Sequence, residues 1–196
     1  MPEVRTIAVI GAGPGGREIA RAAAQAGYRT LLEDILPASL RRAENEIRRH
    51  LEQAVERGHS SRSDAESALS RIEYVGSIEA AARAADLVIE AVPDEMESKL
   101  EIFLLLDKMC RPGTILVSNT ATLSISEIAA TTWRASKVLA MRFGDPARPR
   151  LEIVRGEQTD GPTLAAVTEV ARRIGREVVV VADRPSRSAP APAPKA

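Results

Sequence analysis

A glycine-rich segment near the N-terminus has the residue types and spacing that bind a diphosphate. The segment reads Gly11-Ala12-Gly13-Pro14-Gly15-Gly16 and fits the pattern Gly-x-Gly-x-x-Gly. It follows a short apolar run at residues 5–10, typical of a buried strand, and opens the helical spacing of residues 16–27. In that setting the first glycine permits a tight turn, the second lets a pyrophosphate approach the backbone, and the third allows close helix packing. The start of the helix adds free N–H groups and partial positive charge, so we favour a phosphate site over a plain turn.

An acidic pair ends the next apolar run, residues 28–32. Asp34 lies 18 residues beyond Gly16, close to the spacing of about 20 at which a carboxylate binds the adenosine ribose. Such a carboxylate repels the 2′-phosphate of NADP, and no arginine follows until Arg41 and Arg42. The pattern predicts an NAD(H) site formed by Gly11, Gly13, Gly16 and Asp34. Glu33 is the competing ribose ligand because a strand end can shift by a residue, and a solvated strand end is the alternative for either acid.

Short apolar runs alternate with helical patterns along the rest of the chain. Strands are predicted over residues 5–10, 28–32, 73–75, 86–92, 114–118, 138–141, 151–154 and 177–181. Helices are predicted over residues 16–27, 77–84, 95–110, 124–127 and 161–174, with a charged helical hairpin over about 37–72. This order predicts an α/β fold of Rossmann type, with a doubly wound, mostly parallel sheet in residues 1–183. The Pro/Ala-rich residues 184–196 are predicted to be a disordered or polyproline-like tail.

Composition excludes several classes of partner. Lys and Arg number 27 and Asp and Glu also number 27, so the net charge gives no reason to expect nucleic acid or an anionic membrane. The apolar runs are too short to span a bilayer, and no signal peptide is visible. The single cysteine, Cys110, excludes an internal disulfide and suits a reducing compartment, so we expect a cytoplasmic protein. We interpret Cys110 as a buried helix-end residue, and we predict no metal site.

Beyond these features, the sequence resembles the NAD-binding, N-terminal domain of the 3-hydroxyacyl-CoA dehydrogenases, from about residue 6 to about residue 183. The segments that carry the resemblance are the glycine loop and residues 27–35, 85–94, 114–120, 123–129 and 151–156. The most specific are Ala85-Asp86-Leu87-Val88-Ile89-Glu90-Ala91-Val92-Pro93-Asp94 and Thr114-Ile115-Leu116-Val117-Ser118-Asn119-Thr120. The resemblance implies NAD-dependent oxidation of a 3-hydroxyacyl-CoA in fatty acid metabolism.

By this resemblance, four residues line the nicotinamide half of the cofactor site: Ala91, Asp94, Lys99 and Asn119. A solvated helix lysine is the alternative for Lys99, and Asp94 stands where the family usually has glutamate. In family members the helical hairpin receives part of the CoA. Its phosphates could meet Arg48, Arg49 and Arg57, although a charged helix face is more often simply solvated.

The catalytic segment departs from the family pattern. Oxidising a secondary alcohol needs a group that accepts the hydroxyl proton, and the family has a His-Phe-Phe-Asn-Pro segment whose histidine a later glutamate orients. Here the segment reads Met141-Arg142-Phe143-Gly144-Asp145-Pro146, so Arg142 occupies the histidine position. Arginine stays protonated and cannot act as a base near neutral pH. Glu152 occupies the position of the orienting acid, and we expect it to form an ion pair with Arg142.

Other family features are also altered. Ala121 replaces the family's substrate-contacting serine, with Thr122 displaced beside it, and His50 and His59 both fall in the hairpin. Where the family continues into an all-helical domain that closes the substrate cleft, this chain has its Ala-Pro repeats. The cofactor half of the site therefore matches the family, and the reacting half does not.

Three functional hypotheses follow. The first is an NAD(H)-binding domain with weak or no dehydrogenase activity alone. The second is an active NAD-dependent oxidoreductase on a 3-hydroxyacyl-type or acidic substrate, with an acyl-CoA or carrier-bound acyl group as partner; Arg142 would clamp an anion and a homodimer partner or second subunit would complete the cleft. The third is a regulatory module that senses NAD(H) and docks through its tail.

Overall fold

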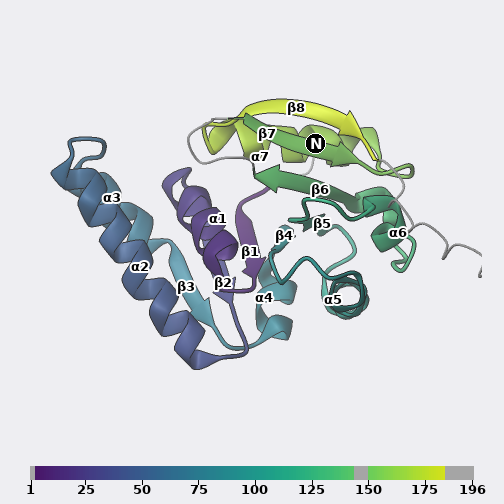
Figure 1. Ribbon diagram of the computed structural model, residues 1–196, viewed down its shortest axis with the longest axis horizontal. Helices are drawn as coiled ribbons and strands as arrows, with labels where there is room; N and C mark the ends of the chain where they lie inside the picture. Colours follow the sequence, from purple (N-terminus) through teal and green to yellow (C-terminus); the bar gives the residue numbers. More distant parts are fainter. Residues whose placement is uncertain (1–2, 144–149, 184–196) are drawn as a thin grey trace, which may run out of the picture.

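The computed structural model describes residues 3–143 and 150–183 (Figure 1). Its strands are β1 (Thr6–Ile10), β2 (Arg29–Glu33), β3 (Ile72–Val75), β4 (Leu87–Glu90), β5 (Ile115–Ser118), β6 (Val138–Phe143), β7 (Arg150–Arg155) and β8 (Glu177–Ala182). Its helices are α1 (Pro14–Gln25), α2 (Pro37–Glu56), α3 (Arg62–Ser70), α4 (Ile78–Ala84), α5 (Met96–Met109), α6 (Ile125–Ala129) and α7 (Gly161–Arg173), with a 3-10 turn at Ala135–Lys137. The predicted tail and residues 144–149 lie outside the described residues.

One sheet runs through the described residues in the order β3-β2-β1-β4-β5-β6-β7-β8. Every neighbouring pair is parallel except β6 and β7, which are antiparallel. The predicted doubly wound, mostly parallel sheet is confirmed. The strand order reverses between β1 and β4, and in open α/β sheets ligands bind at the carboxyl edge beside such a reversal.

Helices cover both faces of this sheet because its central strands are apolar on both sides. All five residues of β1 are buried, and its four apolar residues alternate between two hydrophobic clusters. Ile7 and Val9 belong to the cluster that includes residues of α1, α2, α3 and α7, whereas Ala8 and Ile10 belong to the cluster that includes residues of α4, α5 and α6. Strands buried on both faces read as continuous apolar runs, which is why β1 and β4 could be located from the sequence.

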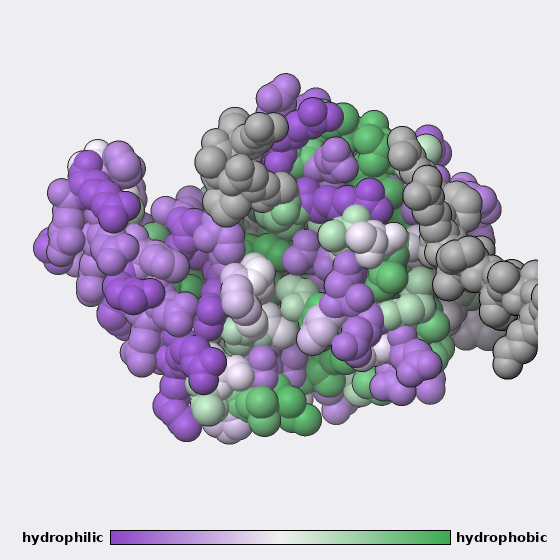
Figure 2. All heavy atoms as spheres, viewed as in Figure 1, coloured by the Kyte–Doolittle hydropathy of each residue, from purple (hydrophilic) through white to green (hydrophobic). Residues whose placement is uncertain are grey.

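The predicted helical hairpin is confirmed as α2 and α3. The chain turns at Gly58, which has a positive φ of 71° that suits glycine, and the Ser61 hydroxyl caps α3 by accepting a hydrogen bond from the Asp64 N–H at 3.0 Å. The inner face of α2 buries Ala43, Ile47 and Leu51. The hairpin lies beyond α1 at the β3 end of the sheet (Figure 1), and on the face seen in Figure 2 its surface is mostly hydrophilic.

Cys110 is buried, as expected, and burial raises the pKa of its thiol to about 11, so it is a poor nucleophile. Among the described residues, no helix combines the length and apolarity that crossing a bilayer requires.

Candidate dinucleotide site

The glycine loop connects β1 to α1 at the carboxyl edge of the sheet. Gly11 has a φ of 101°, and a Cβ atom there would lie 3.0 Å from the Ala91 carbonyl oxygen. A Cβ atom at Gly16 would overlap the carbonyl oxygen of Gly11. At Gly13, by contrast, nothing lies within 4 Å of the added Cβ position. The three glycines thus have the geometry expected of a tight turn, a close helix contact and an open approach to the backbone.

The start of α1 is built to face an anion. Gly13 is the N-cap in extended conformation, Pro14 follows it, and the first turn holds no acidic side chain. Its unpaired N–H groups and the helix dipole therefore favour a phosphate. The amide nitrogen of Asn119, from the end of β5, lies 3.3 Å from the position that a Cβ of Gly15 would occupy. This contact brings Asn119 beside the loop.

Asp34 is the acid that lies against the glycine loop. One carboxylate oxygen accepts a hydrogen bond from the Ala12 N–H at 2.9 Å, and the other accepts one from the Leu36 N–H at 2.9 Å. The carboxylate is thereby held between the loop and the start of α2. Glu33 takes a different position: its side chain is buried on the opposite side of β2. A dinucleotide whose diphosphate lies on the loop would meet Asp34 first.

We expect Asp34→Asn to weaken the discrimination between NAD and NADP. The amide keeps the size of the side chain but removes the charge that repels a 2′-phosphate. Isothermal titration with both dinucleotides should show weaker NAD binding and an NADP:NAD affinity ratio raised about tenfold, a difference of about 1.4 kcal/mol. An unchanged ratio would place the ribose away from this acid.

Lys99 forms an enclosed ion pair in the predicted nicotinamide half. Its side chain is 0% exposed, and its ammonium donates to both Glu90 oxygens at 2.8 and 2.9 Å and to the Asn119 carbonyl at 3.1 Å. All three N–H groups are therefore used within the protein. The alternative of a solvated helix lysine is wrong, because α5 packs this side chain against the ends of β4 and β5.

Glu90, the last residue of β4, is a site residue that the sequence reasoning missed. Besides Lys99, it accepts hydrogen bonds from the Ser118 hydroxyl at 2.7 Å and the Val92 N–H at 2.8 Å. Burial raises the pKa of this carboxyl, while Lys99 and the hydrogen bonds act against that rise. A charged residue inside the apolar run 86–92 was the available signal. The pair ties β4, β5 and α5 together directly below the edge of the sheet.

Asp94 and Ala91, the other two residues predicted for the nicotinamide half, lie at the same edge of the sheet. Asp94 accepts a hydrogen bond from the Ala121 N–H at 3.1 Å and lies 3.8 Å from the Lys99 ammonium. The Ala91 N–H donates to the Ile10 carbonyl at 2.8 Å. The structure therefore brings Ala91, Asp94, Lys99 and Asn119 together around the ends of β1, β4 and β5.

The expected ion pair between Arg142 and Glu152 is wrong. The two residues do face each other across β6 and β7, but no ion pair between them is present among the described residues. Instead Arg142 Nε donates to the Thr120 carbonyl oxygen at 3.1 Å. The guanidinium turns toward the end of β5, on the other side of β6, where the Thr120 carbonyl accepts its hydrogen bond. It is therefore next to the Asn119–Ala121 segment of the site.

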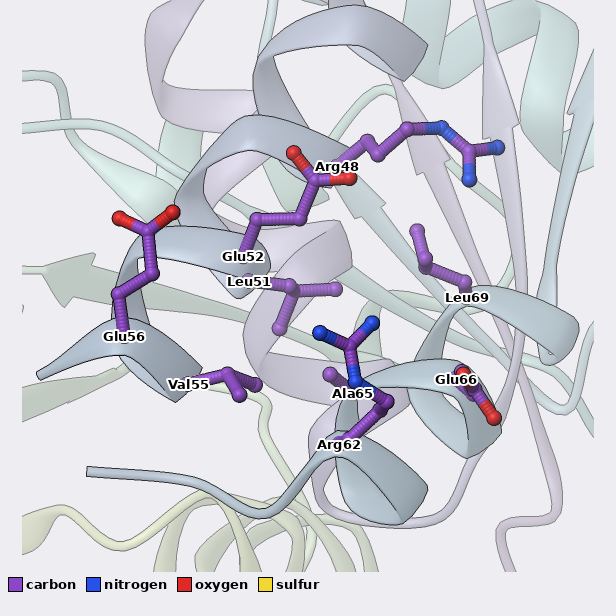
Figure 3. A pocket seen from close by; sticks show the side chains of 9 residues that line it. All are labelled: Arg48, Leu51, Glu52, Val55, Glu56, Arg62, Ala65, Glu66 and Leu69. Atoms are coloured by element: carbon purple, nitrogen blue, oxygen red, sulfur yellow. The ribbon is translucent and has the colours of Figure 1, made fainter. Parts of the chain in front are cut away.

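The hairpin holds a separate hollow of about 320 Å³ between α2 and α3. Figure 3 shows charged side chains from both helices around it: Arg48, Glu52 and Glu56 from α2, and Arg62 and Glu66 from α3. Of the arginines considered for CoA phosphates, only Arg48 lines this hollow. Three carboxylates beside two guanidinium groups do not favour a phosphate. This geometry supports the solvated alternative for the hairpin arginines.

Two other candidate chemistries have no matching site in the described residues. His50 and His59 are exposed on the hairpin, as expected for residues outside a catalytic centre. No group of three or more His, Cys, Asp and Glu side chains in residues 3–143 and 150–183 is placed to hold a metal ion.

Comparisons with known proteins agree with this geometry. The family model described as "3-hydroxyacyl-CoA dehydrogenase, NAD binding domain" matches residues 6–184. A probable 3-hydroxybutyryl-CoA dehydrogenase of Bacillus subtilis (strain 168) is 36% identical over 185 residues, covering 93% of this chain and 64% of that protein. A 3-hydroxyadipyl-CoA dehydrogenase of Escherichia coli (strain K12) is 37% identical over 181 residues, covering 91% of this chain and 38% of that protein.

Solved structures give the same result. The crystal structure of (S)-3-hydroxybutyryl-CoA dehydrogenase from Ralstonia eutropha superimposes with a TM-score of 0.90 at 31% identity, covering 94% of this chain and 65% of that one. The chain thus spans less than two thirds of the length of these relatives. The open backbone at Gly13, the α1 N-terminus and Asp34 fit the dinucleotide that the family model names. This chain belongs to the 3-hydroxyacyl-CoA dehydrogenase family, and the part described here is the family's NAD-binding domain.

Proposed function

We propose that this chain holds NAD(H) and, by its own residues, transfers hydride slowly or not at all. The adenosine half of the cofactor would bind at Gly11, Gly13, Gly16 and Asp34, and the nicotinamide half at Ala91, Asp94 and Asn119. Lys99 would not contact the cofactor, because its own side chain is enclosed; it would position Glu90 and Asp94 instead. When bound, NAD supplies the hydride acceptor; the protein's part is to position it and to move the hydroxyl proton.

The observation that carries the proposal is the position of Arg142. The resemblance assigns the proton-accepting histidine to this residue, and its guanidinium donates to the Thr120 carbonyl. A guanidinium has no acceptor lone pair and stays protonated at neutral pH, so it cannot take a proton from an alcohol. A positioned general base typically contributes about 10²- to 10⁴-fold to the rate. Ala121, in place of the family's serine, removes a hydroxyl from the same edge.

The test measures binding and turnover in parallel. Isothermal titration of this chain with NAD should show saturable binding, and NADH oxidation with acetoacetyl-CoA should run at least about 10²-fold below that of the Bacillus subtilis relative assayed beside it. Gly13→Ala, designed to block the cofactor, gives the background rate. Turnover comparable to that of the relative would overturn the proposal.

The Arg142 guanidinium also favours a second function, catalysis on a substrate that carries an anionic group. The planar fork of Arg142 suits a carboxylate or phosphate, so the chain could act on an acidic, acyl-CoA or carrier-bound acyl substrate within a cytoplasmic homodimer or with a second subunit. In that case Arg142→Gln should abolish activity that depends on the partner. A monomer by light scattering, with no activity under any pairing, would count against this second function.

A further inference from the structure

Glu33 is a buried carboxyl at the mouth of the dinucleotide site that the site described above does not use. It is the last residue of β2 and only 6% exposed. In the sheet register it lies between Ile10 of β1 and Val75 of β3. Leu31, two residues earlier and hence on the same side of β2, packs in the cluster with α4 and α5. Glu33 therefore faces that apolar side, opposite to Leu32.

The carboxyl of Glu33 has no partner among the described residues. Within residues 3–143 and 150–183 its side chain takes part in no hydrogen bond or ion pair, and burial, followed by the charge of Asp34, raises its pKa to about 7. The fully enclosed unpaired side-chain oxygens of the described residues are those of Tyr74 and Asp183. The Glu33 oxygens are not among them, so they are not fully enclosed and keep some access to solvent. An unpaired buried carboxyl destabilises a fold, and a ligand that hydrogen-bonds to it would remove that cost.

A ligand that reaches Glu33 is already implied by its neighbour. Asp34, the next residue, is fixed against the glycine loop where the ribose would lie. The purine base is bonded directly to that ribose, so it must lie within a residue or two of Asp34. Ile35 is 82% exposed beside it, and Val92 is half-buried in the Glu33-side cluster. Exposed apolar side chains with one polar group are the surroundings that a flat base requires.

We propose that Glu33 hydrogen-bonds to the edge of the purine base and makes the site selective for adenine over hypoxanthine. The inference rests on the dinucleotide pose of the proposed function. A protonated carboxyl has one donor and one acceptor, as the amide of Asn or Gln has, and such amides pair with the 6-amino group and N7 of adenine. Hypoxanthine carries an oxygen beside N7 in place of the amino group, so this edge presents two acceptors, and one oxygen of the Glu33 carboxyl would face an acceptor in either orientation.

The experiment compares NAD with nicotinamide hypoxanthine dinucleotide by isothermal titration near pH 6, where the acid is mostly protonated. The intact chain should bind NAD about 10- to 100-fold more tightly. Glu33→Gln, the amide isostere of the neutral acid, should keep the preference. Glu33→Val should bind both dinucleotides about equally, and it should fold at least as well, because valine matches the apolar neighbours in the register.

The titrations distinguish the role of Glu33 from NAD binding itself. Equal binding of the two dinucleotides by the intact chain, or an undiminished preference in a folded Glu33→Val, overturns the role of Glu33 and leaves NAD binding intact. Failure of the intact chain to bind either dinucleotide overturns the proposed function and this inference together. Thermal melting monitored by circular dichroism establishes that each variant is folded before titration.

Discussion

Lys99→Met is expected to lower the free energy of unfolding by about 3–5 kcal/mol. Methionine fills a similar volume but leaves the Glu90 carboxylate enclosed, with only Ser118 and the Val92 N–H as partners. An uncompensated buried charge is far more costly than a missing surface ion pair. Urea unfolding followed by circular dichroism should show a lower midpoint with an unchanged slope.

Lys108→Met is the matched control for this change. Lys108 lies on the same helix, α5, and its side chain is exposed, so its replacement should change stability by no more than about 0.5 kcal/mol. The double variant Glu90→Gln/Lys99→Met removes both charges and keeps an acceptor for Ser118, so it should recover most of the loss. Equal midpoints for Lys99→Met and Lys108→Met would show that the pair contributes nothing to stability.

The same variant should respond to pH in a defined direction. Burial raises the pKa of Glu90, and Lys99 is the main influence that lowers it. Without Lys99 the folded protein binds this proton more tightly than the unfolded chain does. Stability therefore increases as the carboxyl is protonated, and the deficit of Lys99→Met should shrink as the pH falls from about 8 to about 5. A deficit that grows on acidification would contradict the assignment of the buried charge to Glu90.

The fold and the positions of the candidate adenosine-binding residues were predictable because their signals are local. Apolar runs, the three glycines and the acid after β2 each act within a strand, a turn or the first residues of a helix. The spacing alone therefore located Gly11, Gly13, Gly16 and Asp34 at one edge of the sheet. The choice between Asp34 and Glu33 was left open, since a shift of one residue reverses the face of a strand.

The side-chain contacts of the candidate nicotinamide and catalytic positions could not be predicted in the same way, because they join residues of different strands and helices. The Glu90–Lys99 pair joins the end of β4 to the second turn of α5, and the sequence pattern says only that one acid interrupts an apolar run. Arg142 and Glu152 were expected to form an ion pair, and they do face each other across β6 and β7. The sequence pattern could not predict that the Arg142 guanidinium would turn away from β7 and donate to the Thr120 carbonyl, which lies on the β5 side of β6. Side-chain direction depends on which acceptors the tertiary fold leaves unpaired.

Gly16→Ala is expected to lower the stability of the fold, whereas Gly13→Ala is expected to weaken NAD binding. Both variants place one methyl group in the same loop. At Gly16 the methyl overlaps the backbone carbonyl of Gly11, so the loop or α1 must move. Overpacking of this kind typically costs about 1–3 kcal/mol, and more where backbone has to shift. At Gly13 the methyl meets nothing, and the backbone, with φ −66° and ψ −178°, accommodates alanine.

NAD affinity separates the two positions. The open space over Gly13 is where the pyrophosphate would approach the backbone, so Gly13→Ala should keep the melting temperature within a few degrees and weaken NAD binding by more than about tenfold. Gly16→Ala should lose stability first and binding as a consequence. Gly76→Ala, where the added methyl also meets nothing, controls for the substitution itself. If Gly13→Ala bound NAD as well as the intact chain, the diphosphate could not lie on this loop, and the cofactor pose argued from Asp34 and Glu33 would be lost with it.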